Sequence, residues 1–188
     1  VRKDDDYYHI GGGGHMIDSC GSGYVIGRKA IRAALRAVDG SDQPTMLVEM
    51  LEEAAGFPLW YRLDQIYTRG RAYVASFAHV MFEARNKGDI VARRIFNECA
   101  SDLADVIWAQ YKKNGGPYDL IFNGGIFRNY PEYADAVKAM APKDMRIFFA
   151  DVSPVYGGAV EALYDIGIRA DEAFREKFMS SYEEIKKK

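Results

Sequence analysis

Two glycines that follow a short apolar segment are the sharpest chemical feature of this sequence. Gly124 and Gly125 come directly after Tyr118–Asn123 (Tyr-Asp-Leu-Ile-Phe-Asn), which has the length and apolar character of a buried strand. Ligands of open parallel sheets bind at the carboxyl ends of strands. Glycine there lets a nucleotide lie against bare backbone, where any Cβ would collide with it. A tight turn gives the same sequence, so nucleotide binding and a structural turn both stay open, and the segment is neither a Walker loop nor a dinucleotide fingerprint.

A second strand end lies further along the chain. Residues 151–154 (Asp-Val-Ser-Pro) follow the apolar run 146–150, and Gly157 and Gly158 fall inside the start of the next predicted helix. Each glycine inside a helix costs about 1 kcal/mol relative to alanine. Close approach of another backbone would explain them, and so would contact with a ligand.

Glycines also gather near the start of the sequence. Residues 11–14 are four consecutive glycines, and residues 19–23 (Ser-Cys-Gly-Ser-Gly) form a second small-residue patch. Neither a helix nor a strand interior favours such runs. A flexible linker and a loop that approaches a ligand are both consistent with them.

The elements that must position these glycines can be predicted from hydrophobic periodicity and from start and stop signals. We expect a β-hairpin over residues 1–10, with its turn at the three aspartates 4–6. Residues 57–68 are rich in aromatics and are consistent with a helix or an irregular connection. The last third alternates strand, helix, strand, helix, which is typical of a parallel α/β sheet. The predicted strands cover 118–123 and 146–150, and the predicted helices cover 24–38, 44–55, 70–86, 89–113, 131–140, 156–164 and 171–188.

Composition limits the classes of function. With 188 residues, 48% of them apolar, the chain can build one domain with a sizeable core. The 25 basic and 27 acidic residues nearly cancel, so we expect no nucleic-acid partner. No apolar run reaches the roughly 18 residues of a membrane span. Two cysteines, Cys20 and Cys99, are too few for a disulfide framework. We therefore expect a cytoplasmic protein with free thiols and no membrane partner, in which Cys99 lies on the core face of a helix.

Four segments together resemble a known family. Residues 11–16 (Gly-Gly-Gly-Gly-His-Met) and 21–30 (Gly-Ser-Gly-Tyr-Val-Ile-Gly-Arg-Lys-Ala) are similar to the second domain of N-acetylglucosamine kinases, in the BadF/BadG/BcrA/BcrD ATPase family. Residues 123–127 (Asn-Gly-Gly-Ile-Phe) resemble that family's adenosine motif, and residues 153–159 resemble its closing helix. The resemblance runs from about residue 8 to about residue 168, with the motifs in the family's order.

The resemblance implies an α/β fold: the C-terminal domain of an RNase-H-like, actin-like ATPase. We expect this one domain to span residues 1–188, with a sheet core at about 1–12 and 117–168. A helical insert would occupy about 24–113 and a C-terminal helix 171–188. The family's N-terminal domain, which supplies a phosphate loop and the aspartate base, and a second phosphate loop before Val1 are expected to be missing from this chain.

The resemblance also implies ATP with Mg²⁺ as cofactors and a small-molecule sugar as substrate. The nucleotide-binding residues would be Gly124, Gly125, Ile126 and Phe127, and the sugar-binding residues Gly12, Gly13, Asp18 and Ser19. No catalytic residue and no metal ligand is assigned to this chain. We therefore expect the C-terminal lobe of an ATP-dependent N-acetylhexosamine-type kinase, a lobe that is inactive alone and whose partner is the N-terminal domain.

Departures from the family pattern keep two alternatives open. Gly13 stands where the family has tryptophan, and Ser19 stands where it has an aspartate that bonds the sugar, which favours a non-catalytic regulatory or interaction domain on the same fold. Residues 18–23 also fit the Asp-x-Cys-x-x-Gly segment of iron–sulfur dehydratase activators, with Cys20 as ligand. A dimer with a Cys₄ cluster needs two such cysteines per chain, and Cys99 is the other one.

The aromatic-rich helices favour a homodimer, because such surfaces need burial.

Overall fold

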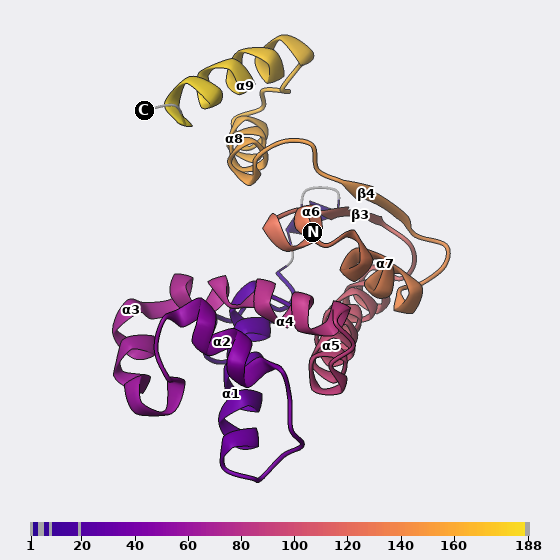
Figure 1. Cartoon of the computed structure of the whole chain (residues 1–188). Helices are drawn as coiled ribbons and strands as arrows, with labels where there is room; N and C mark the ends of the chain where they lie inside the picture. The colour runs from indigo at the N-terminus through magenta and orange to yellow at the C-terminus, as the bar shows by residue number, and fades with distance from the viewer. Residues whose placement is uncertain (1, 4–5, 8, 19, 187–188) are drawn as a thin grey trace.

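A computed structural model describes residues 2–3, 6–7, 9–18 and 20–186 of the chain. The fold is α/β and rich in helices, with a small parallel sheet to one side of a helical body (Figure 1). The predicted hairpin is confirmed in its pairing: β1 (Arg2–Lys3) pairs antiparallel with β2 (Asp6–Tyr7). Asp6, which was predicted in the turn, lies in β2, and the other two aspartates of the predicted turn, at 4–5, lie outside the described residues. Among the described residues, this hairpin and the parallel sheet are separate two-stranded sheets.

The helical body consists of five α-helices and a short 3₁₀ helix within residues 23–114. Helix α1 begins where the Ser22 side chain accepts a hydrogen bond from the Val25 N–H (3.3 Å), as at many helix starts. The Asp89 carboxylate caps α5 in the same way, accepting from Ala92 N–H (2.7 Å), and also accepts from Met46 N–H (2.7 Å), which ties α2 to α5. The elements are α1 (Gly23–Val38), α2 (Leu47–Ala55), η1 (Leu59–Arg62), α3 (Leu63–Ser76), α4 (Ala78–Asn86) and α5 (Ile90–Asn114).

The single helix predicted over 70–86 is wrong. Helices α3 and α4 meet at Phe77, and α3 starts at Leu63 and is kinked at Gly70, whose φ of 74° and ψ of −166° lie outside the helical region. Such angles are essentially restricted to glycine. The hydrophobic periodicity runs through the break at Phe77 and gave no sign of it.

The last third contains the predicted strands and helices, with one addition. Strands β3 (Asp119–Phe122) and β4 (Arg146–Phe149) are parallel, with Asp119 opposite Arg146 and Phe122 opposite Phe149. Between them lie α7 (Pro131–Met140) and a five-residue helix, α6 (Gly125–Asn129), which the sequence did not predict. Parallel strands require such a crossover.

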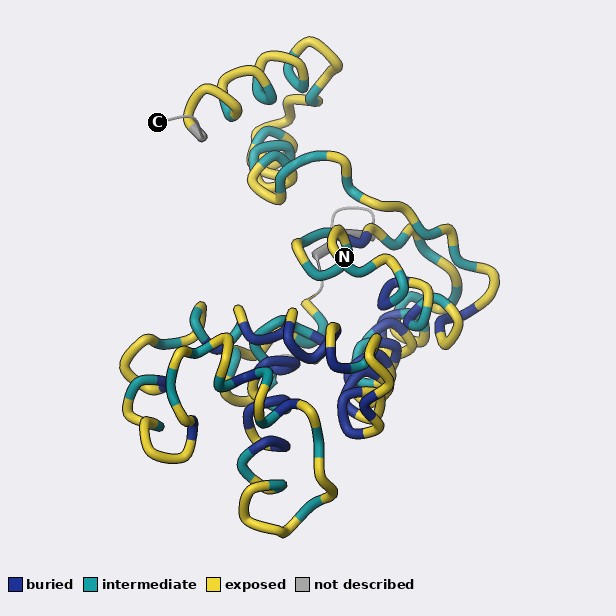
Figure 2. Tube along the Cα trace, in the orientation of Figure 1, coloured by how far each residue is buried: buried dark blue, intermediate teal, exposed yellow. Residues whose placement is uncertain are grey.

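One hydrophobic core joins the helical body to α7. Tyr133 of α7 is fully buried, and its ring contacts Phe82 (5.8 Å), Phe96 (5.4 Å) and Phe127 (5.9 Å). Figure 2 shows the buried residues concentrated in the helical body and α7. Cys99 of α5 is fully buried in this core, as predicted.

The C-terminal helices lie apart from that core (Figures 1 and 2). No described residue of α8 (Pro154–Asp165) or α9 (Glu172–Lys186) is buried. The two helices contact each other through Tyr156 and Phe178, with ring centroids 5.3 Å apart. A Cβ added at Gly157 or Gly158 would meet nothing within 4 Å, so close packing does not explain these glycines.

Candidate functional site

The first part of the candidate site is the Gly-Gly pair at the carboxyl end of β3. Gly124 has φ +113°, a conformation that favours glycine, and its N–H donates to the Asn123 Oδ1 (2.7 Å). Gly125 is different: it begins α6, its φ is not in the positive range, and a Cβ there would meet nothing within 4 Å. The turn therefore requires glycine at position 124, whereas neither the turn nor the packing requires it at position 125.

The side chains that follow the pair pack against the fold. The Phe127 ring stacks on Phe122 at 4.4 Å, and the Ile126 side chain lies 3.4 Å from the position a Cβ would take at Gly23. Ile126 and Phe127 thus support the Gly-Gly turn from beneath. The helix that begins directly at this turn is the five-residue α6, and the longer helix α7 begins only at Pro131.

The second part is the glycine loop that precedes α1. The Asp18 carboxylate holds this loop: its Oδ2 accepts from Gly13 N–H (3.3 Å) and its Oδ1 from the Cys20 thiol (3.7 Å). Asp18 N–H also donates to Gly14 O (2.9 Å). Gly12 has φ +73°, and a Cβ there would lie 2.8 Å from His9 Nε2. The loop is therefore a folded turn, and the linker interpretation of the glycine run is wrong.

A cavity of about 480 Å³ opens beside this loop. Of the residues predicted to bind the sugar, Gly12 and Asp18 line it together, Gly13 is not part of its lining, and Ser19 lies outside the described residues. The wall also includes Gly14, His15, Ser22, Gly23 and Tyr24, which belong to the glycine segments but were not predicted as site residues, and Arg71, Ala72 and Ala75, which no sequence pattern selected. Arg71 comes from α3, more than 50 residues away in the sequence, so no local pattern could have identified it.

The glycine loop is anchored to the segment that follows the Gly-Gly pair. The Tyr133 hydroxyl donates to Gly21 O (3.3 Å), and a Cβ at Gly21 would lie 2.8 Å from that hydroxyl oxygen. Together with the approach of Ile126 to Gly23, this contact joins the loop to α6 and α7. The two predicted half-sites therefore lie on directly contacting segments.

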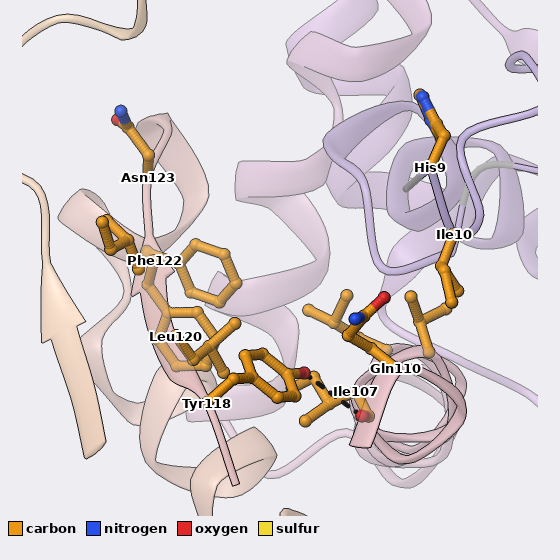
Figure 3. Close-up of a pocket in the computed structure, with 12 residues that line it drawn as sticks. His9, Ile10, Ile107, Gln110, Tyr118, Leu120, Phe122 and Asn123 are labelled. Carbon is orange, nitrogen blue, oxygen red and sulfur yellow. Dashed lines mark hydrogen bonds between the residues drawn. The ribbon is translucent and has the colours of Figure 1, made fainter. Parts of the chain in front are cut away.

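A further cavity of about 410 Å³ runs along β3 and α5 (Figure 3). It reaches Asn123, beside Gly124, and His9 and Ile10 lie on its opposite side. Gln110 of α5 points into it and is only 3% exposed, and neither its Nε2 nor its Oε1 has a hydrogen-bond partner among the described residues. The sequence analysis missed Gln110, because its burial depends on how α5 packs.

The thiols do not form a metal site among the described residues. Burial, followed by the nearby Asp18 carboxylate, raises the pKa of Cys20, and burial raises the pKa of Cys99 to about 12. The described residues contain no group of three or more histidine, cysteine, aspartate or glutamate side chains placed to hold a metal ion. Within that part of the chain, no helix is long and apolar enough to span a membrane.

Comparisons with known proteins identify the family to which this chain belongs. The sequence profile of the BadF/BadG/BcrA/BcrD ATPase family matches residues 1–163. An N-acetylmuramic acid/N-acetylglucosamine kinase of Clostridium acetobutylicum is 33% identical over 150 residues, which are 71% of this chain and 47% of that protein. The fold is similar to the solved structure of a candidate N-acetylglucosamine kinase from Chromobacterium violaceum, with a TM-score of 0.59 and 19% identity over 76% of this chain and 46% of that one.

The chain thus spans about half the length of these relatives. The profile match covers both glycine segments and the whole parallel sheet. The chain belongs to the BadF/BadG/BcrA/BcrD ATPase family.

Proposed function

We propose that this chain is the C-terminal lobe of an ATP-dependent kinase of N-acetylhexosamines, with the RNase-H-like fold of actin-like ATPases. The observation that carries the nucleotide half of this proposal is Gly125. A Cβ at Gly125 would meet nothing within 4 Å, and the backbone there does not require glycine. A glycine at such a position is expected where a ligand must lie directly against the backbone. The adenosine would lie against Gly124 and Gly125, with Ile126 and Phe127 supporting the turn beneath them.

The sugar would occupy the cavity beside the glycine loop. Gly12 and Asp18 line it, and Gly13 with Ser19 would complete the loop. The Clostridium relative, named for both N-acetylmuramic acid and N-acetylglucosamine, supports amino sugars as the substrate class. The substrate is therefore proposed to be an N-acetylated amino sugar.

We propose that the chain alone does not transfer phosphate. Phosphoryl transfer depends on phosphate clamps, Mg²⁺ and a base that orients the nucleophile. Of the described residues, Asp18 is the only carboxylate that lines the sugar cavity, and its hydrogen bonds to Gly13 and Cys20 already engage it. Mg²⁺, which would neutralise charge on the phosphates, would reach this lobe with the nucleotide, and the base would come from an N-terminal lobe.

The cavity in Figure 3 supports a role as one lobe of a larger assembly. Strand β3 pairs with β4 along one edge, and its other edge borders this cavity. Ile121 is 63% exposed there, and the Gln110 amide has no hydrogen-bond partner in the part of the chain that the structure describes. Unpaired edges and buried amides are both costly, so we propose that further polypeptide of the complete kinase covers this edge.

A non-catalytic role on the same fold is the second candidate. Gly13 and Ser19 replace the tryptophan and aspartate of the related kinases, and the Asp18 carboxylate is occupied within its own loop. A domain that kept the fold and lost sugar binding would show these features.

The test is calorimetry of ATP and ADP with Mg²⁺, on this chain and on the polypeptide of its complete gene. The variant Gly125→Val adds bulk where the fold has space, so it should weaken nucleotide binding about tenfold or more without a change in thermal unfolding. Gly157→Ala, at another open helical glycine, is the control. Absence of nucleotide binding by the complete gene product would remove the kinase proposal, and measurable turnover by the 188-residue chain would overturn its role as a half-site.

We also propose a homodimer formed through η1 and α3. Trp60, Tyr61 and Tyr67 are exposed there by 48%, 80% and 81%. Sedimentation velocity of the chain and of Tyr61→Ser would test it: a monomer at all concentrations would remove the dimer, whereas a dimer weakened by Tyr61→Ser would support it.

A further inference from the structure

A groove of about 510 Å³ lies between α1 and α3. Its floor consists of aliphatic side chains from both helices, which are Ile31, Leu35, Leu63, Ile66 and Val74. Ile31, Ile66 and Val74 are buried, so the floor is continuous with the hydrophobic core. A hydrocarbon tail that lies along such a floor is removed from water, which favours its binding.

The sides of the groove leave large side chains in water. Met16 and Tyr67 both line the groove and are largely exposed. Tyr24 also lines it and is half-buried. A ligand on the floor would contact these side chains as well and would shield apolar surface that the fold leaves uncovered.

Three arginines determine the charge that suits this groove. Arg28 and Arg32 on α1 and Arg71 on α3 line it, and no aspartate or glutamate of the described residues does. Within that part of the chain these three arginines form no ion pair. Arg94, on the neighbouring surface, differs because it lies 2.8 Å from the Asp42 carboxylate. Unbalanced guanidinium groups around one groove create a positive potential that attracts an anion and repels a cation.

We propose that the groove binds a free amphiphilic anion with a long hydrocarbon tail. The tail would lie on the aliphatic floor, and the head group, a carboxylate or a phosphate, would form charge-assisted pairs with the arginines. An uncharged apolar segment of another polypeptide would leave the three arginines without a counter-charge, so it suits the groove less well. This site goes beyond the proposed function, since neither a nucleotide nor a sugar takes part in it.

The experiment is a titration of the isotope-labelled 188-residue chain, followed by amide chemical shifts. The probes are decanoate, octanoate and decylammonium, each below the concentration at which it forms micelles. Decanoate should bind about tenfold more tightly than octanoate, because two further CH₂ groups leave water. Decylammonium, which has the same tail length and the opposite charge, should cause no shifts in the groove. The shifts caused by decanoate should lie on α1 and α3.

Two variants locate the head group. Arg28 lines the groove but not the cavity beside the glycine loop, so Arg28→Gln tests the groove alone. It should weaken decanoate binding roughly fivefold, as expected for one exposed ion pair. Arg93→Gln removes the same charge from an exposed position on α5, outside the groove, and should leave the affinity unchanged. Thermal unfolding would show that both variants are folded.

Several outcomes would overturn this site. Equal affinity for decanoate and octanoate would show that the floor does not hold the tail. Equal decanoate affinity of Arg28→Gln and the parent chain, or tight binding of decylammonium, would show that the arginines do not select an anion. Binding to phosphatidylglycerol vesicles without binding of monomeric decanoate would assign this face to a membrane surface. Groove shifts that follow protein concentration in the absence of any probe would assign it to a second copy of the chain.

Discussion

Gln110 combines nearly complete burial with an amide group that has no hydrogen-bond partner within residues 2–3, 6–7, 9–18 and 20–186. Leaving such a group without hydrogen bonds costs about 1–3 kcal/mol. We therefore predict that Gln110→Leu stabilises the 188-residue chain by roughly 1 kcal/mol, as measured by urea unfolding.

Gln110→Glu serves as the opposing variant. It places a charge in the same cavity, so it should destabilise the chain. If Gln110→Leu destabilises the chain as well, the amide must have a partner in solution, and the view of this cavity as an uncovered strand edge would be wrong.

The raised pKa of Cys99 predicts how the free energy of unfolding responds to alkaline pH. Burial raises its pKa from the ordinary 9.0 to about 12, so the folded state holds the thiol proton more tightly than the unfolded state does. The resulting contribution of Cys99 to the free energy of unfolding is fully present below pH 9 and is lost as the pH rises toward 12. Urea unfolding at pH 8, 10 and 11 should show a falling free energy of unfolding.

Buried tyrosines add to the same trend, since burial also raises the pKa of Tyr118 to about 12. Cys99→Ala should therefore make the alkaline loss smaller without abolishing it. An identical pH dependence in the variant and the parent chain would show that Cys99 ionises freely in the folded state.

At the scale of elements, the crossing of α1 over the junction of α3 and α4 depends on Gly27. A Cβ at this position would lie 2.0 Å from the backbone oxygen of Val74, a contact that backbone atoms cannot relieve by a rotamer change. We predict that Gly27→Ala destabilises the chain by roughly 3 kcal/mol, because the two helices must move apart. Thermal and urea unfolding would measure the loss.

Gly157→Ala is the matched comparison. Gly157 is also helical but its surroundings are open, so alanine should stabilise α8 by about 0.5–1 kcal/mol. Equal effects of the two substitutions would mean that α1 does not approach Val74 closely.

Element types were predictable where periodicity and capping residues agreed. The helix at 131–140 was predicted with its observed bounds, and α1 and α5 were predicted to within a residue or two. The break at Phe77 was missed because packing against α1, and no proline or polar cluster, ends the helix there. Tertiary contacts override local propensity in such cases.

At the scale of the whole molecule, α9 adds little to the main core. Its described residues are not buried, and its ring contacts are with α8 or within itself. We predict that trypsin cleaves early at Arg169, an exposed residue in the connection between α8 and α9, and releases residues 170–188. The remaining chain should keep its thermal midpoint within about 2 °C, because a loss well below 1 kcal/mol moves the midpoint little.

Lys87 provides an internal control for this cleavage. It is equally exposed, but it lies in the short turn between α4 and α5, beside the buried Asp89, and both helices belong to the core. Cleavage at Lys87 as early as at Arg169, or a large fall in the midpoint after loss of 170–188, would show that α9 stabilises the core.

The sequence by itself determined the family, the α/β character and the two glycine segments, since each depends on residues close together in the chain. A strand that ends in Gly-Gly and a loop of glycines ahead of a capped helix are local patterns. Only the tertiary structure decided what surrounds them. Arg71 reaches the cavity beside the glycine loop because α3 packs on α1 and bends at Gly70, and Gln110 is buried because of the way α5 lies along β3. The physical reason is that burial, charge balance and cavity walls arise between segments distant in sequence, where the periodicity of any one segment carries no information about its neighbours.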